Sequence, residues 1–235
     1  CDIYNADFRW EWFPKPGELI AVSIFYKYLK NPIEMLEENS TPGTVIFMYQ
    51  NADYAENMGV EFEIRKSFDI FHKALKDFSL MFNYAIIEST IHVGSDTTTP
   101  YTNTERPLQG QSPYTINAGL GYDNEKIGFA GNVLFNIAGR RIKRVGTLYG
   151  VGADNRGTKR GDVYEEPAPL LDVVLKQKIW KGQLKFTAAN LLDPEIKLTQ
   201  KREKAAGPQK LGTREFTIES YKKGTNYSIS YTQKI

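Results

Sequence analysis

Hydrophobic and polar residues alternate along most of this chain, and a period of two is the pattern of a β-strand whose two faces meet different surroundings. Between Tyr4 and Trp12 every second residue is apolar or aromatic, and the residues between them are polar or charged. Eight later segments repeat the pattern, so the sequence predicts nine strands, most of them about ten residues or longer. The alternating apolar positions lie within 4–12, 20–28, 60–64, 80–86, 114–122, 127–137, 171–175, 184–188 and 227–231.

The connections between these strands alternate in length. Short turns are predicted at 14–17, 123–126 and 181–182, and the connection at 67–77, which can form a small turn of helix, lies at the same end. Long polar loops are predicted at 30–46, 88–112, 139–168 and 193–215. Long strands with short turns at one end and long loops at the other favour an outer-membrane β-barrel, since soluble sandwiches have shorter strands and short loops at both ends.

The second face of the strands is strongly polar. It carries the following side chains: Arg9, Glu11, Glu61, Glu63, Arg65, Asn83, Asn117, Asn132, Asn136 and Lys185. Burying so many polar groups would be prohibitive, so this face must be wet, as in a wide barrel that lines an aqueous lumen. Four aromatic residues lie at strand ends beside short turns, where amphipathic rings would meet lipid headgroups: Trp10, Trp12, Tyr122 and Trp180.

The composition excludes further classes of protein. The 235 residues are 41% hydrophobic and 13% aromatic, too apolar for a disordered chain, and the net charge of +2 is too small for a dedicated nucleic-acid binder, so no nucleic-acid partner is expected. The longest apolar run, Val45–Tyr49, is far too short for a transmembrane helix, and the first residues do not form a signal peptide.

The residues offer little evidence for a catalytic site or a metal site. The single cysteine, Cys1, excludes an intrachain disulfide and a cysteine-based metal cluster. The two histidines, His72 and His92, are predicted at opposite ends of the strands, and no nucleophile motif is present. We therefore expect no enzyme activity and no cofactor.

Four segments carry a more specific signal: residues 57–63 (NMGVEFE), 106–117 (RPLQGQSPYTIN), 190–193 (NLLD) and 224–231 (GTNYSISY). In combination they resemble the C-terminal barrel strands of TonB-dependent outer-membrane receptors of the Bacteroidetes type, SusC-like or siderophore-receptor-like. The resemblance implies an all-β fold, an antiparallel up-and-down transmembrane wall of about nine strands from a 22-stranded barrel. Residues 1–235 would then be a C-terminal fragment without plug or signal peptide.

The resemblance also implies a function and its partners. Such a receptor lies in the outer membrane of a Gram-negative bacterium and imports a siderophore, glycan, peptide or similar ligand. Its expected partners are membrane lipid and lipopolysaccharide, the remaining barrel and plug, the TonB complex through the missing N-terminal part, and the outer-membrane assembly machinery. The alternative from another class is a soluble all-β carbohydrate-binding module that uses exposed Tyr and Trp side chains as stacking platforms.

Two candidate sites follow. The most basic stretch, loop 139–165, suits an anionic ligand or lipopolysaccharide phosphates, with a solvated loop as the alternative, and its candidates are Arg140, Arg141, Lys143 and Arg144. The terminal strand resembles the signal that the assembly machinery recognises, with an ordinary lipid-facing strand as the alternative, through Lys222, Gly224, Tyr227, Ile229 and Tyr231.

The terminal segment also contains a change of register. Tyr227, Ile229 and Tyr231 occupy odd positions, whereas Phe216 and Ile218 occupy even ones, so one regular strand would place the two sets on opposite faces. The sequence predicts a bulge or a break near Gly224. The break is favoured, with the membrane-spanning part starting near Tyr221 and Phe216 and Ile218 in the outer loop.

Overall fold

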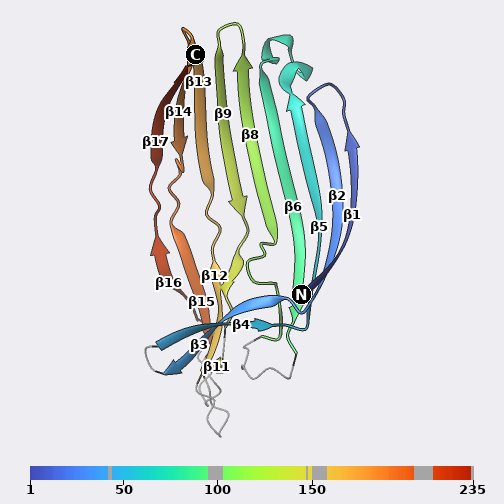
Figure 1. Ribbon diagram of the computed structural model, residues 1–235, viewed down its shortest axis with the longest axis vertical. Helices are drawn as coiled ribbons and strands as arrows, with labels where there is room; N and C mark the ends of the chain where they lie inside the picture. Colours follow the sequence, from blue (N-terminus) through green and yellow to red (C-terminus); the bar gives the residue numbers. More distant parts are fainter. Residues whose placement is uncertain (42–43, 95–102, 147, 150–157, 204–213, 234–235) are drawn as a thin grey trace.

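The computed structural model describes residues 1–41, 44–94, 103–146, 148–149, 158–203 and 214–233. Nine long antiparallel strands follow one another in a single curved sheet (Figure 1). In sheet order they are β1 (Asp2–Trp12), β2 (Leu19–Lys30), β5 (Tyr54–Ser67), β6 (Phe78–His92), β8 (Tyr114–Asn124), β9 (Phe129–Ala138), β13 (Leu170–Ile179), β14 (Gly182–Ala189) and β17 (Asn226–Gln233). Each of the nine predicted strands corresponds to one of them, so the predicted all-β, up-and-down architecture is confirmed. The sheet is open, with β1 and β17 at its edges.

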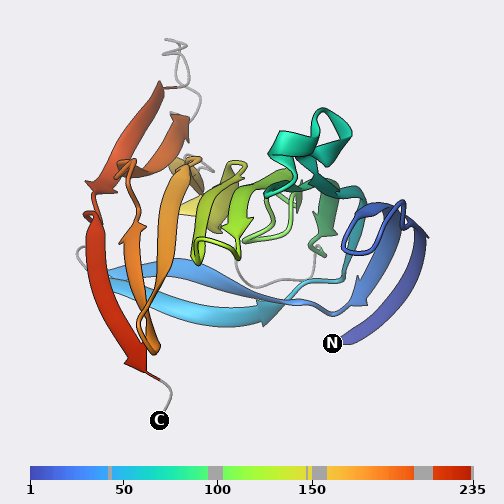
Figure 2. The same cartoon turned by 90° about the horizontal axis from the view of Figure 1, so that it is seen from above.

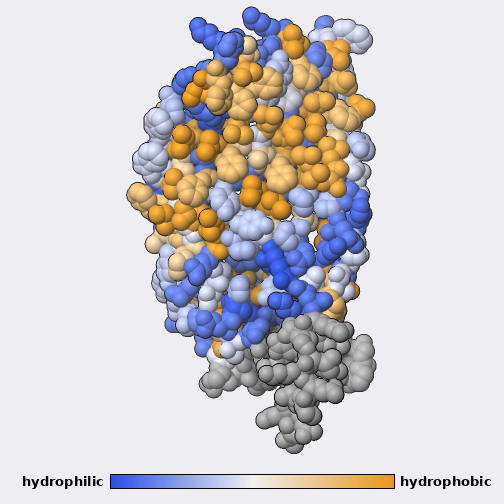
Figure 3. All heavy atoms as spheres, turned by 180° about the vertical axis from the view of Figure 1, so that it is seen from behind, coloured by the Kyte–Doolittle hydropathy of each residue, from blue (hydrophilic) through white to orange (hydrophobic). Residues whose placement is uncertain are grey.

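Strand register places the predicted apolar side chains on one face. One row of paired residues crosses seven strands: Trp12, Ile20, Ile64, Phe82, Ala118, Phe135 and Leu171. A second row runs Leu80, Leu120, Val133, Val173, Ala188 and Tyr227. Figure 2 shows the curvature of the sheet, and the view of its convex side in Figure 3 shows a broad apolar band that gives way to polar residues at one end.

The concave face carries the polar residues. The row next to Trp12 contains Glu11, Ala21, Glu63, Asn83, Asn117 and Asn136. Glu63 lies between two arginines, with Arg9 Nη2 at 2.8 Å and Arg65 Nη2 at 2.7 Å from its carboxylate oxygens. Asn136 donates to the side chain of Asn117. The predicted division into an apolar face and a polar face is confirmed, and the contact of the polar face with water stays a prediction.

The two ends of the sheet differ. At the short-turn end lie the tight connections, the end of β17 and two 3-10 helices, η1 (Phe68–Ile70) and η2 (Lys73–Leu75), in the connection predicted to contain a helical turn (Figure 1). No helix among the described residues is long and apolar enough to cross a membrane. The opposite, long-loop end carries the remaining strands.

The long-loop end corrects the prediction of long polar loops, because much of it forms strands. It contains β3 (Ile33–Thr41), β4 (Thr44–Asn51), β7 (Glu105–Arg106), β10 (Arg141–Arg144), β11 (Leu148–Tyr149), β12 (Thr158–Glu165), β15 (Ile196–Glu203) and β16 (Arg214–Tyr221). These segments lack a clean apolar face, yet paired backbones still satisfy their N–H and C=O groups, so alternation alone could not reveal them. The β3–β4 hairpin extends across the concave side of the main sheet (Figure 2), and β10, β11, β12, β15 and β16 form a second sheet.

The strands break where the two sheets meet. β16 ends at Tyr221 and β17 begins at Asn226, so the predicted break is confirmed, with the long strand starting five residues later than Tyr221. Phe216 and Ile218, predicted in the outer loop, lie in β16. Gly224 between them has φ +79°, and its backbone N–H donates to Asp193 Oδ1 at 2.9 Å. Asn190, with φ +58°, donates from Nδ2 to Gly224 O at 2.8 Å. The NLLD segment therefore fixes the break between β14 and β15 to the break between β16 and β17.

We expect Gly224→Ala to lower the free energy of unfolding by about 1 to 2 kcal/mol, because an L-residue is strained at this positive φ. Urea unfolding in lipid vesicles measures the change. Gly119→Ala is the matched control: its added Cβ meets the flexible end of Leu134, Cδ2, at 3.2 Å, and its effect should be smaller. Equal losses in the two variants would contradict the role of Gly224 in the break.

Candidate functional site at the long-loop end

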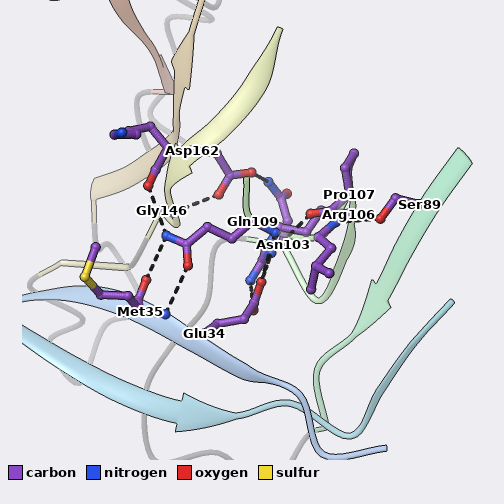
Figure 4. Close-up of polar contacts among 11 residues, drawn as sticks. Glu34, Met35, Ser89, Asn103, Arg106, Pro107, Gln109, Gly146 and Asp162 are labelled. Carbon is purple, nitrogen blue, oxygen red and sulfur yellow. Dashed lines mark hydrogen bonds and ion pairs between the residues drawn. The ribbon is translucent and has the colours of Figure 1, made fainter. Parts of the chain in front are cut away.

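A buried ion pair holds the β3–β4 hairpin in place. Because β7 pairs Arg106 with Ile91 at the end of β6, the arginine side chain points to the concave side, where it reaches Glu34 of β3 (Figure 4). The contact is bidentate: Arg106 Nη1 donates to Glu34 Oε1 at 2.8 Å, and Nη2 donates to Oε2 at 2.5 Å. Both side chains are at most 2% exposed. A bidentate pair of this kind fixes direction as well as distance.

Gln109 completes the attachment. Its side-chain amide accepts from Met35 N at 3.0 Å and donates to Met35 O at 3.2 Å, so it pairs with β3 as a neighbouring strand would (Figure 4). The same Nε2 donates to Lys143 O of β10 at 3.0 Å. Glu34, Arg106 and Gln109, here called the brace, thus join the hairpin to the RPLQGQSPY segment and to the second sheet.

A small apolar core lies beside the brace. It consists of Ala52, Ala55, Ile91, Val93, Ile142 and Val145, with Leu29, Leu108 and Tyr164 packed against it. Gly110 adopts φ +81° and donates its N–H to Ile142 O at 2.9 Å, which ties the turn after Gln109 to β10. The brace is therefore held on a packed platform, and the hairpin that it fixes stays across the concave side.

The predicted basic candidates lie next to this platform and contact carboxylates. Arg140 Nε is 2.9 Å from Glu166, Arg140 Nη2 contacts Glu215, and its guanidinium lies 4.2 Å from the ring centroid of Tyr164. Arg141 and Lys143 contact Glu165 at 2.6 and 3.4 Å. Arg141, Lys143 and Arg144 belong to β10, which corrects their placement in a loop. Their binding of an anion stays a prediction, and the structure gives three of them a role in joining the strands of the second sheet.

Burial and nearby charges shift the pKa values of two side chains beside these arginines, Glu165 and Tyr164. Burial raises the pKa of Glu165, but the hydrogen bond and charge of Arg141, together with Lys143, outweigh it and leave the pKa below the usual range. Burial raises the pKa of Tyr164, and the charge of Asp162 adds to that rise. At neutral pH the Glu165 carboxylate is therefore ionised and the Tyr164 hydroxyl is neutral.

The terminal candidates lie along an edge of the main sheet. Tyr227, Ile229 and Tyr231 pair with Ala188, Phe186 and Leu184 of β14, and the whole of β17 is exposed. Lys222 lies 3.6 Å from Asp193 in the break. Recognition of this strand by an assembly machinery stays a prediction, and the geometry provides the exposed, pairable edge that it requires.

Comparison with known proteins identifies the family to which this architecture belongs. The family model described as TonB dependent receptor-like, beta-barrel matches residues 3–191. The chain belongs to this receptor barrel family. The crystal structure of the siderophore receptor PirA from Acinetobacter baumannii is similar, with a TM-score of 0.55 and 16% identity over 97% of this chain. That match spans only 31% of PirA, so this chain corresponds to less than a third of that receptor. A comparison with curated proteins found no match.

The aromatic candidates lie toward the short-turn end of this receptor wall. Trp10 and Trp12 are 51% and 52% exposed on the convex side, Tyr122 packs on Phe78 with 4.8 Å between ring centroids, and Trp180 in the β13–β14 turn is 97% exposed. Their contact with lipid stays a prediction. A second aromatic group at the long-loop end was missed, although its strand positions share one parity: Tyr4, Tyr28, Tyr54 and His92.

Sequence reasoning also missed the brace. Arg106 and Gln109 stood within a segment recognised as a whole, and Glu34 stood in a predicted loop. No signal in the residues links positions 72 apart, because the contact depends on the hairpin folding over the sheet. Among the described residues no group of three or more His, Cys, Asp or Glu side chains is placed to hold a metal ion.

We expect Arg106→Met to destabilise the long-loop end by about 3 to 5 kcal/mol, because Glu34 would remain buried without its partner. Hydrogen exchange of the β3 and β4 amides measures the loss. The double variant Glu34→Met/Arg106→Met should regain most of it. Lys15→Met, which removes a solvent-screened pair with Asp69, is the control and should have a much smaller effect. Similar effects of Arg106→Met and Lys15→Met would contradict the brace.

The lowered pKa of Glu165 gives the second sheet a defined pH response. Its stabilising contribution is complete above the ordinary glutamate pKa of about 4.3 and is lost as the pH falls through the lower value of the folded state. Protection factors of the β10 amides should therefore drop only in the acid range. Glu165→Gln should abolish this drop, and an unchanged pH response in that variant would show that Glu165 is not its source.

Proposed function

We propose that this chain is the C-terminal part of the barrel wall of a TonB-dependent outer-membrane importer, about nine strands of 22. The observation that carries the proposal is the series of apolar rows on the convex face, opposed by charged and amide rows on the concave face. Lipid would cover the first face, and water or a plug would meet the second. A soluble carbohydrate-binding module would expose this apolar band to water, which speaks against that alternative.

Orientation follows from the two ends of the sheet. In bacterial outer-membrane barrels short turns face the periplasm and long loops face the outside. The short-turn end with the end of β17 would then be periplasmic, and the braced hairpin and second sheet would form the extracellular mouth. Import would be driven by the TonB complex, acting through an N-terminal part of the receptor together with its plug.

The exposed edges of the sheet fit a larger wall. An unpaired strand edge invites pairing, and a closed barrel removes both edges. We infer that β1 and β17 pair with the remaining strands of the receptor. The assembly machinery would engage β17 before closure, through the edge that carries Tyr227, Ile229 and Tyr231.

The cargo is proposed as a siderophore, glycan, peptide or similar nutrient, carried by a transporter without enzyme activity. The resemblance of segments such as RPLQGQSPY favours a receptor of the Bacteroidetes type. The similarity to a siderophore receptor makes ferric siderophores the first class to test. Arg140, Arg141, Lys143 and Arg144 at the mouth are candidates for contact with an anionic cargo or with lipopolysaccharide phosphates.

Charges placed on the two faces should differ in cost. Arginine at Ile24, Phe82 or Leu120 would meet lipid and should lower stability by about 2 to 4 kcal/mol near the midplane. The same substitution at Asn83 or Asn117 would meet the lumen and should be tolerated. Urea unfolding of the receptor in phospholipid vesicles gives both values, and equal tolerance at the two sets would refute a membrane barrel.

Uptake tests the transport itself. Cells carrying the receptor should accumulate one of three labelled probes, ferric siderophores, oligosaccharides or peptides, and this accumulation should be lost when the receptor gene is deleted. Inactivating the TonB complex should abolish accumulation and leave binding at the cell surface intact. Accumulation that persists without the TonB complex would overturn the proposed energy coupling.

A further inference from the structure

The connection between β5 and β6 exposes large apolar side chains at the short-turn end. Residues 68–77, here called the lobe, fold as η1 and η2, and within them Ile70 is 59% exposed, Phe71 76% and Leu75 37%. Phe68 packs edge-on against Phe71, with 5.9 Å between ring centroids. A polar turn would be sufficient to join the two strands. The exposed apolar side chains therefore indicate that the lobe contacts something other than water.

Polar contacts on both flanks hold the lobe in one orientation. Lys15 of the β1–β2 turn contacts Asp69 Oδ2 at 2.8 Å. On the other flank Asn124 Nδ2 donates to Asp77 Oδ2 at 2.6 Å, and Asp123 N donates to Asp77 O at 2.8 Å. Lys15 also holds the pKa of Asp69 below its usual range. The exposed apolar side chains are thus presented by an element tied to its neighbours, and they do not fold back onto the wall.

The lobe projects from the convex side of the wall. In Figure 2 it lies outside the curved sheet, whereas the β3–β4 hairpin lies across the opposite, concave side. Phe78, the first residue of β6 after the lobe, lines a shallow apolar groove of about 360 Å³ together with Leu120, Tyr122, Phe129 and Leu175. The apolar surface therefore continues from the middle of the convex face to the base of the lobe.

Charge on the lobe matches a lipid headgroup layer. The ten residues carry two lysines and two aspartates: Lys73 and Lys76 are exposed beside Phe71, whereas Asp69 and Asp77 are engaged by Lys15 and Asn124. Short amphipathic elements with lysines beside large apolar side chains lie at the boundary between headgroups and acyl chains, where each group meets its preferred surroundings.

We propose that the lobe is a membrane anchor that inserts Ile70 and Phe71 into the periplasmic leaflet, with Lys73 and Lys76 at the lipid phosphates. The proposal rests on the proposed placement of the wall in the outer membrane. The anchor would fix the depth of the barrel at β5 and β6, next to the turns that the lobe contacts.

Spin-label accessibility in the receptor tests the proposal. Cys1 and any other cysteine are replaced by serine, and single nitroxide labels are attached at Phe71→Cys, Ile24→Cys or Lys126→Cys. The receptor is reconstituted in vesicles of phosphatidylethanolamine and phosphatidylglycerol, and collisions with oxygen, which favours lipid, are compared with collisions with a water-soluble nickel chelate. Lys126, in the neighbouring β8–β9 turn, is the aqueous control, and Ile24 reports on the middle of the convex face.

The labels at positions 71 and 24 should both collide several-fold more often with oxygen than with nickel, and the label at 126 should show the reverse. An aqueous label at 71 beside a lipid-exposed label at 24 would overturn the anchor and leave the barrel placement standing. An aqueous label at 24 would refute the barrel placement itself. Protection of position 71 from both reagents would point to a protein contact and would also overturn the anchor.

Discussion

Hydrogen bonding of nine strands in one consistent register is the constraint on which the rest of this structure depends. Because side chains alternate across a strand, aligned pairs such as Phe82–Ala118 and Asn83–Asn117 carry their faces from one strand to the next. A slip by one residue at any pair would exchange the two faces for all strands beyond it. The separation of an apolar convex face from a polar concave face is therefore a property of the whole sheet.

The long-loop end departs from this regularity at defined places. The strand breaks at Asn190–Asp193 and at Gly224 release the chain from the register of the main sheet, so that β15 and β16 can pair in a second sheet. The brace then uses a buried ion pair and one amide to join this sheet to the β3–β4 hairpin. A buried pair contributes direction more than net stability, which suits a contact whose task is to fix an extended hairpin.

The sequence was sufficient to predict the main sheet but not the long-loop end, for a physical reason. In a strand such as β8 the two faces differ in polarity. Ile116, Ala118 and Leu120 lie on one face and Asn117 and Gly119 on the other, so the strand can be predicted from the alternation. β15 pairs with β12 and β16, but its buried residues Leu198 and Thr199 are adjacent in the sequence at a shift of register, so the strand shows no alternating pattern. The brace depends on residues 72 positions apart that meet only after the hairpin folds, and the partners of Arg140 and Arg141 come from three separate strands or connections.

Alternating chemical accessibility along β8 tests the central claim most directly. Single cysteines at each position from Thr115 to Tyr122, in the receptor reconstituted in phospholipid vesicles, would be reacted with a membrane-impermeant maleimide. The account predicts reaction at the concave positions, such as Asn117 and Gly119, and protection at the convex positions, such as Ile116 and Leu120. Uniform reaction along the strand, or protection of the concave positions alone, would contradict it.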